Sequence, residues 1–328
     1  MINRILLIRP DKIGDLVLTL PMAAVIKASI PDANLAFLVR DYTAPLLTLA
    51  SDVDETIVYN TELSLGKTIS ILRAARVDAI FFFGSKFKLT LAAFIARIPL
   101  RVGRAFWWYS FLYNKKIYEH RKTAERNEAE YNVRMLRAIG IERNQAPLPN
   151  IDHERLPAFT LPHSNYIALH ITTGGSAQAW DKEHFIELAN LLKQEFDTPL
   201  ILTGTADDNV FLFNIAERMK HCSCIVHIQT ENTLLELAAL LASAKLVISG
   251  STGPGHLAAA LGTPTIGLFP GVVALSKERW GFRGKKVVNL SPLIKPKKQC
   301  PNCKDCICIN EITTFQVMQA IKDLNIQI

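Results

Sequence analysis

The opening of the chain lacks the uninterrupted apolar run that a secretory signal or a membrane span requires. It reads MINRILLIRPDKIGD, and Arg9, Asp11, Lys12 and Asp15 interrupt its apolar residues. We therefore expect a cytoplasmic protein. Internal repeats and low-complexity segments are also missing. A content of 49% hydrophobic and 20% charged residues excludes a disordered chain.

Cysteine is scarce, with six residues in 328, which excludes a small disulfide-stabilised scaffold. Four of the six lie together near the C-terminus, at Cys300, Cys303, Cys306 and Cys308. Their spacing matches neither a ferredoxin cluster nor an ordinary four-cysteine zinc site. Reduced thiols, a local disulfide or a metal knuckle remain open for them, and we assign the protein no metal and no cofactor.

Two nucleotide-binding motifs are missing as well. The sequence contains neither the G-x-x-x-x-G-K pattern of P-loop proteins nor the G-x-G-x-x-G pattern of dinucleotide-binding domains. These absences argue against a P-loop NTPase and against a Rossmann oxidoreductase.

Charge is unevenly distributed, although the net excess is only +7. Between Arg97 and Arg143, eleven Lys/Arg stand against five Glu. Aromatic residues are interleaved with them, at Phe106, Trp107, Trp108, Tyr109, Phe111, Tyr113 and Tyr118. A solvated face would also have this charge, but the mixture favours peripheral contact with an anionic membrane. No nucleic-acid-binding motif accompanies it, so we expect no nucleic-acid partner.

Short apolar runs alternate with longer helical patterns, which is typical of βαβ units and a parallel sheet. The chain is long enough for two domains, and the proline-rich segment 144–165 suits a linker. We predict an α/β fold with two Rossmann-like doubly wound domains, 1–150 and 151–328, whose strands point their carboxyl ends at a central cleft. We expect the final helix, residues 314–324, to pack back on the N-terminal domain.

The predicted strands are the apolar runs of this alternation. In the first half they are 4–9, 35–40, 55–59, 79–84 and 100–103, and in the second half 166–172, 199–203, 224–228, 245–250 and 265–269. A helix is predicted over 18–29, directly after the first loop.

Three loops that follow predicted strands carry candidate site residues. In the first, Gly14 permits a tight turn and Asp15 stands at the start of a helix, either as an N-cap or as a general base. The second, around Thr172 and Thr173, and the third, from Ser251 to His256, combine hydroxyl and glycine residues that suit a phosphate. His170 lies in an apolar strand and is better read as a satisfied core residue.

With these loops the sequence resembles the lipopolysaccharide heptosyltransferases of glycosyltransferase family 9. The resemblance is carried by R-x-D-x-I-G-D-x-V-L-T-L-P near the start and by S-T-G-P-x-H-L-A-A-A-L-G-T-P-T-I-G-L-F late in the chain. It implies a GT-B fold and an inverting, metal-independent transfer of heptose from an ADP-sugar donor. The implied acceptor is lipid A–Kdo or the inner core of lipopolysaccharide, at the inner face of the inner membrane.

The resemblance also implies roles for individual residues. Asp15 matches the catalytic base, and Asp208 matches an acidic position that contacts the nucleotide. The remaining donor-binding positions are Thr172, Thr173, Gln178, Ser251, Thr252, Gly253 and His256. Arg9, Lys12 and Lys86 are candidates for binding the acceptor.

Two of these positions depart from the family pattern. Gln178 replaces a lysine, and Ser251 replaces an aspartate that often precedes Thr-Gly. A neutral amide cannot neutralise a leaving diphosphate, so Lys182 or a basic residue near Lys277 takes over, or the donor or the rate differs. A transferase for another nucleotide sugar, and a non-catalytic member that binds nucleotide or anionic lipid, are the alternatives.

Overall fold

In the computed structural model the chain divides into two compact units, which are described one at a time. Unit 1 contains residues 1–121 and 128–151, and unit 2 contains residues 122–127 and 152–328. The structure describes residues 2–84, 86–158, 165–175, 178–219, 224–229, 234–293 and 308–328. Among these residues, no helix is both long enough and apolar enough to cross a membrane.

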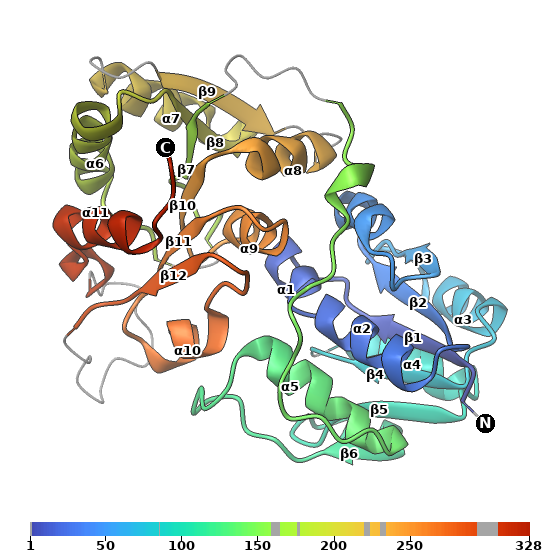
Figure 1. Ribbon diagram of the computed structural model, residues 1–328. Coiled ribbons are helices and arrows are strands. Elements are labelled where there is room, and N and C mark those ends of the chain that lie inside the picture. Colours follow the sequence, from blue (N-terminus) through green and yellow to red (C-terminus); the bar gives the residue numbers. More distant parts are fainter. Residues whose placement is uncertain are drawn as a thin grey trace. The chain divides into compact units, whose positions relative to one another are not determined.

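Unit 1 is built on a six-stranded parallel sheet with the strand order β3-β2-β1-β4-β5-β6 (Figure 1). Its strands are β1 (Arg4–Ile8), β2 (Asn34–Val39), β3 (Glu55–Val58), β4 (Ala79–Phe82), β5 (Leu100–Arg104) and β6 (Lys115–Ile117). Its α-helices are α1 (Ile13–Val17), α2 (Leu20–Ser29), α3 (Leu65–Ala74), α4 (Phe87–Ile95) and α5 (Glu128–Arg134).

The central strands of unit 1 are apolar on both faces because helices cover both faces of the sheet. Every residue of β1 from Ile5 to Ile8 is fully buried, and β4 is buried throughout. β1 pairs with β2 on one side and with β4 on the other, in the registers Ile5↔Leu35 and Ile5↔Ala79. From β1 the chain first adds β2 and β3 on one side of the sheet and then β4, β5 and β6 on the other. In open α/β sheets ligands bind at such a reversal point, outside the carboxyl ends of the strands.

Unit 2 repeats this topology, with the order β12-β11-β10-β7-β8-β9. Its strands are β7 (Ile167–His170), β8 (Leu200–Thr205), β9 (Cys224–Gln229), β10 (Leu246–Gly250), β11 (Thr265–Leu268) and β12 (Val287–Leu290). Its α-helices are α6 (Lys182–Phe196), α7 (Asn209–Arg218), α8 (Leu234–Ser243), α9 (Gly253–Ala260), α10 (Lys277–Trp280) and α11 (Thr314–Asp323). The predicted α/β architecture with two doubly wound parallel sheets is confirmed.

The last helix, α11, packs into the core of unit 2. Val317, Ala320 and Ile321 lie in one apolar cluster with Leu188 and Leu192 of α6, and Figure 1 shows the two helices side by side. Its amphipathic pattern thus buries one face within unit 2, and packing of this helix on the N-terminal domain stays a prediction. A capping box between Thr313 and Gln316 fixes the start of the helix.

The structure differs from the predicted elements at two edges and at one helix. The edge strands β6 and β12 were not predicted, because β6 has three residues, two of them lysine, and β12 is only half-buried. The predicted helix over 18–29 corresponds to α2, and a separate short helix that was not predicted, α1, precedes it. Pro21 stands in the first turn of α2, where the missing N–H of proline costs no hydrogen bond.

Candidate active site

The first loop of unit 1 lies beside the reversal point of the sheet. The chain leaves β1 at Arg9 and enters α1 at Ile13, while the segment after β4 brings Lys86 to the same end of the sheet. Lys86 Nζ lies 2.6 Å from Asp11 Oδ1, so an ion pair joins the segments that follow the two strands. The hydroxyl of Tyr42 donates to the carbonyl oxygen of Asp11 over 3.2 Å.

Asp15 is held by Arg9 from two directions. Arg9 Nη2 donates to Asp15 Oδ1 over 2.6 Å, and Arg9 Nε donates to the backbone oxygen of Asp15 over 3.0 Å. The guanidinium is buried and lies 5.4 Å from the centre of the Phe83 ring. These two hydrogen bonds from Arg9 fix the position of the Asp15 carboxylate. The side chain of Asp15 nevertheless keeps 26% of its surface exposed.

The surroundings of Asp15 change its proton affinity. Burial raises the pKa of Asp15 above its ordinary value, the Arg9 guanidinium opposes this rise, and the carboxylates of Asp11 and Glu128 add to it. A carboxylate with a raised pKa is a stronger base. The first loop therefore presents a positioned and partly accessible base.

The three candidate acceptor residues have different environments. Arg9 is buried between Asp15 and Asp11, from whose Oδ2 its Nη1 is 3.4 Å away, so it serves Asp15. Lys86 is partly exposed and paired with Asp11. Lys12 is exposed and precedes the first residue of α1. Contact of any of them with an acceptor stays a prediction.

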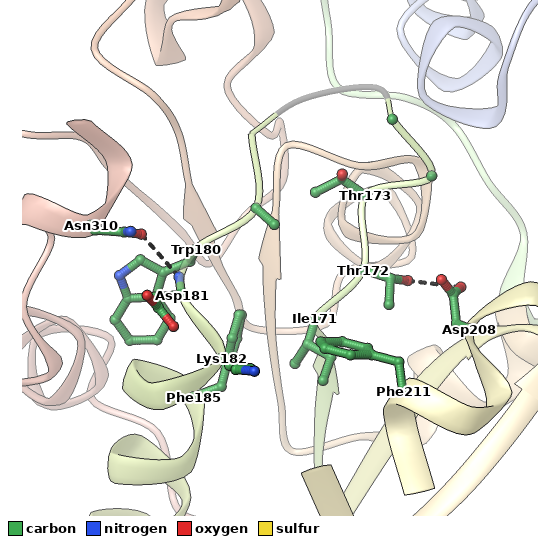
Figure 2. A pocket seen from close by; sticks show the side chains of 13 residues that line it. Ile171, Thr172, Thr173, Trp180, Asp181, Lys182, Phe185, Asp208, Phe211 and Asn310 are labelled. Carbon is green, nitrogen blue, oxygen red and sulfur yellow. Dashed lines mark hydrogen bonds between the residues drawn. The ribbon is translucent and has the colours of Figure 1, made fainter. Parts of the chain in front are cut away.

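In unit 2 a cavity of about 560 Å³ opens at the carboxyl ends of β7 and β8 (Figure 2). Its volume lies in the range typical of small-molecule sites. Three of the predicted residues line it, Thr172, Thr173 and Asp208. The other lining residues are Ile171, Gly174, Gly175, Ala179, Trp180, Asp181, Lys182, Phe185, Phe211 and Asn310.

Asp208 organises the polar side of this cavity. Its Oδ2 accepts hydrogen bonds from Thr172 Oγ1 over 3.0 Å, from Thr205 Oγ1 over 2.8 Å and from the Thr205 backbone N–H over 2.9 Å. Figure 2 shows Thr172 and Asp208 pointing toward one another. Two loops that follow neighbouring strands are thereby tied together.

The sequence reasoning did not assign Trp180, Phe211 and Asn310 to this cavity. Trp180 Nε1 donates to the backbone oxygen of Ile312, and the backbone N–H of Asp181 donates to Asn310 Oδ1 over 2.9 Å. These contacts join positions about 130 residues apart, and no local pattern signals them. Phe211 follows the predicted site residue Asp208 by three residues, and this proximity in sequence is the signal that could have indicated it.

Gln178 is not among the residues that line the cavity. Its side-chain oxygen lies 3.9 Å from the sulfur of Cys308, which is buried and accepts from the backbone N–H of Gly271 over 3.4 Å. The other three cysteines of the tail, at 300, 303 and 306, lie outside the described residues. The structure thus places Gln178 beside the C-terminal segment.

The third loop forms a compact turn between β10 and α9. Thr252 is the residue before α9, and its hydroxyl lies 2.8 Å from Ser249 Oγ inside the turn. Ser251 and Gly253 flank Thr252 and are partly exposed. A methyl group placed on Gly250 would lie 3.8 Å from the methyl group of Thr173, so the two loops are in close contact here. The third loop therefore adjoins the second loop at the reversal point of the second sheet.

His256 is buried in the first turns of α9. Its ring packs edge-on against Phe282 with a centroid distance of 4.8 Å, and burial lowers the pKa of His256 to about 3. It is therefore neutral at physiological pH. Its place is better suited to packing than to pairing with a phosphate charge, and a role toward the donor stays a prediction.

His170 behaves as a satisfied core residue. Its Nδ1 lies 2.9 Å from Thr203 Oγ1 on the neighbouring strand. Burial lowers the pKa of His170 to about 4, which the Asp208 carboxylate partly offsets. The interpretation from its apolar strand is confirmed.

The comparisons with known proteins agree with this architecture. Residues 72–305 match glycosyltransferase family 9 (heptosyltransferase). A protein of Haemophilus influenzae, named provisionally as a glycosyltransferase, is 28% identical over 85% of each chain. Lipopolysaccharide heptosyltransferase 2 of Salmonella typhimurium is 25% identical over 81% of this chain and 82% of its own.

A solved structure supports the same assignment at the level of the fold. The Escherichia coli ADP-heptose lipopolysaccharide heptosyltransferase II superposes with a TM-score of 0.76 over 98% of both chains, at 21% identity. The two doubly wound sheets are accordingly those of a GT-B fold. The family match covers well over half of the chain, and this protein therefore belongs to glycosyltransferase family 9, the heptosyltransferases.

Proposed function

We propose that this glycosyltransferase moves a heptose from ADP-heptose to an inner-core acceptor of lipopolysaccharide with inversion at the anomeric carbon, using Asp15 as the general base. Family membership and the names of the relatives support the sugar and the acceptor class. The observation that carries the proposal is Asp15 itself, a carboxylate of raised pKa that buried Arg9 holds in place and that remains partly exposed.

The chemistry follows from these properties. An acceptor hydroxyl is a weak nucleophile, and Asp15 accepts its proton as the oxygen bonds to the anomeric carbon. The bond from that carbon to the diphosphate breaks on the opposite face, so the configuration inverts. Arg9 keeps one carboxylate oxygen, Oδ1, in place, which lowers the cost of orienting the base.

We assign the donor to the cavity of unit 2. The hydroxyl of Thr173 and the backbone of Gly174 and Gly175 line it together with Lys182, while the Thr172 hydroxyl donates its hydrogen to Asp208 and helps to shape the cavity. Hydroxyl and amide groups bind phosphate oxygens, and an ammonium group stabilises the charge that a diphosphate leaving group gains. The carboxylate of Asp208 is suited to a ribose hydroxyl rather than to a phosphate. The acceptor is a lipid, so we place the reaction at the cytoplasmic face of the inner membrane.

The test of the base is the replacement of Asp15 by Asn, which keeps the shape of the side chain and removes its basicity. We expect turnover to fall by about 10²- to 10⁴-fold, while the dissociation constant for ADP, measured by calorimetry, stays unchanged. Asp32→Asn, at an exposed position of the same unit, is the matched control. Wild-type turnover in the Asp15→Asn variant would show that the base is misassigned.

A different nucleotide sugar is the second candidate donor, because Gln178 stands where the family has lysine and lies outside the cavity lining. Thermal shift with a panel of ADP-, UDP- and GDP-sugars separates the two. Stabilisation by ADP-heptose alone supports the proposal, and stabilisation by a UDP- or GDP-sugar alone contradicts it.

A further inference from the structure

One stretch of unit 1 carries positive charge and no negative charge. Between Asp78 and Glu119 the sequence contains no Asp or Glu. It contains seven cationic residues, namely Lys86, Lys88, Arg97, Arg101, Arg104, Lys115 and Lys116. Of these, Lys86 forms an ion pair with Asp11, while Lys115 and Lys116 are exposed on the edge strand β6. The stretch itself therefore contains no carboxylate that could offset the charge of its exposed lysines.

The same stretch exposes large aromatic side chains. Trp108 is 73% exposed, Phe111 67% and Tyr118 75%. Phe87 of α4 and Phe106 are also exposed. The Phe87 ring lies 4.8 Å from Trp108, and Phe106 lies 6.5 Å from Tyr118. Two pairs of exposed aromatic rings therefore lie on this stretch, and exposed apolar side chains of this size are typical of an interaction site.

Buried tyrosines hold the exposed rings in place. Tyr109 is fully buried, and its hydroxyl accepts a hydrogen bond from the backbone N–H of Lys86 over 2.8 Å. Tyr113 is also buried, and its hydroxyl lies 3.1 Å from Thr90 Oγ1 of α4. Because both anchors fasten the segment between β5 and β6 to the start and middle of α4, the exposed rings are presented from a fixed framework.

We propose that this aromatic–basic surface, made of Phe87, Phe106, Trp108, Phe111, Lys115, Lys116 and Tyr118, docks unit 1 onto an anionic phospholipid bilayer. Tryptophan and tyrosine are favoured at the boundary between water and hydrocarbon, and lysine is attracted to anionic headgroups. A protein surface would have to supply negative charge as well as an apolar face, and a bilayer supplies both. The inference deepens the proposed function, since it names how a lipid-linked acceptor is reached.

The lysines of β6 have a second physical role. Charged side chains on an edge strand discourage pairing with another chain, and β6 is the edge of its sheet (Figure 1). This role accounts for Lys115 and Lys116 but not for the exposed aromatic rings of the same stretch. The exposed aromatic rings therefore favour a docking surface over an edge strand whose lysines only prevent pairing with another chain.

The experiment is vesicle flotation of the full chain at 0.15 M salt, with vesicles of phosphatidylcholine alone or with one quarter phosphatidylglycerol. We expect binding to the anionic vesicles only. Trp108→Ser with Phe111→Ser should weaken it at least tenfold, and Lys115→Gln with Lys116→Gln by on the order of 30-fold. Matched controls are Phe315→Ser, which is 74% exposed on α11, and Lys285→Gln with Lys286→Gln, exposed in unit 2.

The outcomes separate this inference from the proposed function. Flotation requires no donor and no turnover, and every variant should keep wild-type kcat with a water-soluble acceptor fragment. Undiminished flotation of both double variants would overturn the inference, and so would equal losses in the controls. A wild-type oligomer that Trp108→Ser with Phe111→Ser converts to a monomer would overturn it too, because the surface would then bind a second copy of the chain.

Discussion

Replacing Lys182 by Gln should impair the use of the donor. Lys182 is the cation among the described residues that line the unit 2 cavity, where Asp181 and Asp208 are the anions. Its removal leaves a diphosphate facing two carboxylates with no opposite charge in that lining. Lys182 and a basic residue near Lys277 were the alternatives for the charge that Gln178 does not provide, and the lining of the cavity favours Lys182.

The size of the effect follows from Coulomb's law. Two unit charges 4 Å apart interact by about 1 kcal/mol in water and about 4 kcal/mol at an effective dielectric constant of 20. Lys182 is exposed, so solvent screens its charge and the lower part of this range applies. We expect a loss of roughly 1 to 2 kcal/mol, which corresponds to about a 5- to 30-fold fall in kcat/KM for the donor.

The assay is initial rates at varied donor concentration, together with calorimetric titration of ADP. Lys182→Arg should recover most of the loss, and Lys193→Gln on the same helix should have no effect, because Lys193 pairs with Asp197 away from the cavity. If Lys182→Gln matches the wild type in both measurements while Lys277→Gln does not, the reasoning from the cavity is refuted.

Two further predictions concern protons. Arg9→Gln removes the charge that favours ionised Asp15, so the pKa of Asp15 should rise and the acid limb of the kcat/KM profile should move to higher pH; a limb that does not move would exclude Arg9 as its positioning partner. His170 and His256 stay neutral in the fold, with pKa values of about 4 and about 3, whereas the unfolded chain protonates them near pH 6.5. Stability is therefore complete above pH 6.5 and falls below it, by about 2 kcal/mol per histidine at pH 5. Urea unfolding at pH 7.5 and 5.0 measures this loss of stability. If the His170→Phe variant loses less stability between the two pH values than the wild type does, part of the loss is due to His170.

The sequence predicted the parts of the fold that depend on local pattern. The central strands were found because burial on both faces makes them continuous apolar runs, as in β1 and β10. The edge strand β6 was missed because Lys115 and Lys116 give it no such run. The packing of α11 on α6 was not predicted, because an amphipathic face shows that a helix is buried but not against which neighbour.

The candidate site shows the same division. Asp15, Thr172 and Thr173 were singled out because they follow strands, and Asp208 because it matches the family pattern. Thr172, Thr173 and Asp208 line one cavity because the carboxyl ends of neighbouring strands meet at one edge of a parallel sheet. Trp180 and Asn310 were missed because chain segments about 130 residues apart bring them to the cavity. The buried environment of His256 was likewise not visible in its motif, since Phe282, which packs on it, lies far along the chain.

The pair between Lys86 and Asp11 bears on how an acceptor could be chosen. The ammonium group already has an internal carboxylate at 2.6 Å, so an incoming phosphate or carboxylate competes with Asp11 for its charge and its three N–H donors. A neutral sugar carries no negative charge to compete with Asp11 and leaves the ion pair intact. Discrimination at this position would thus rest on a competition between anions, in which the protein brings its own competitor.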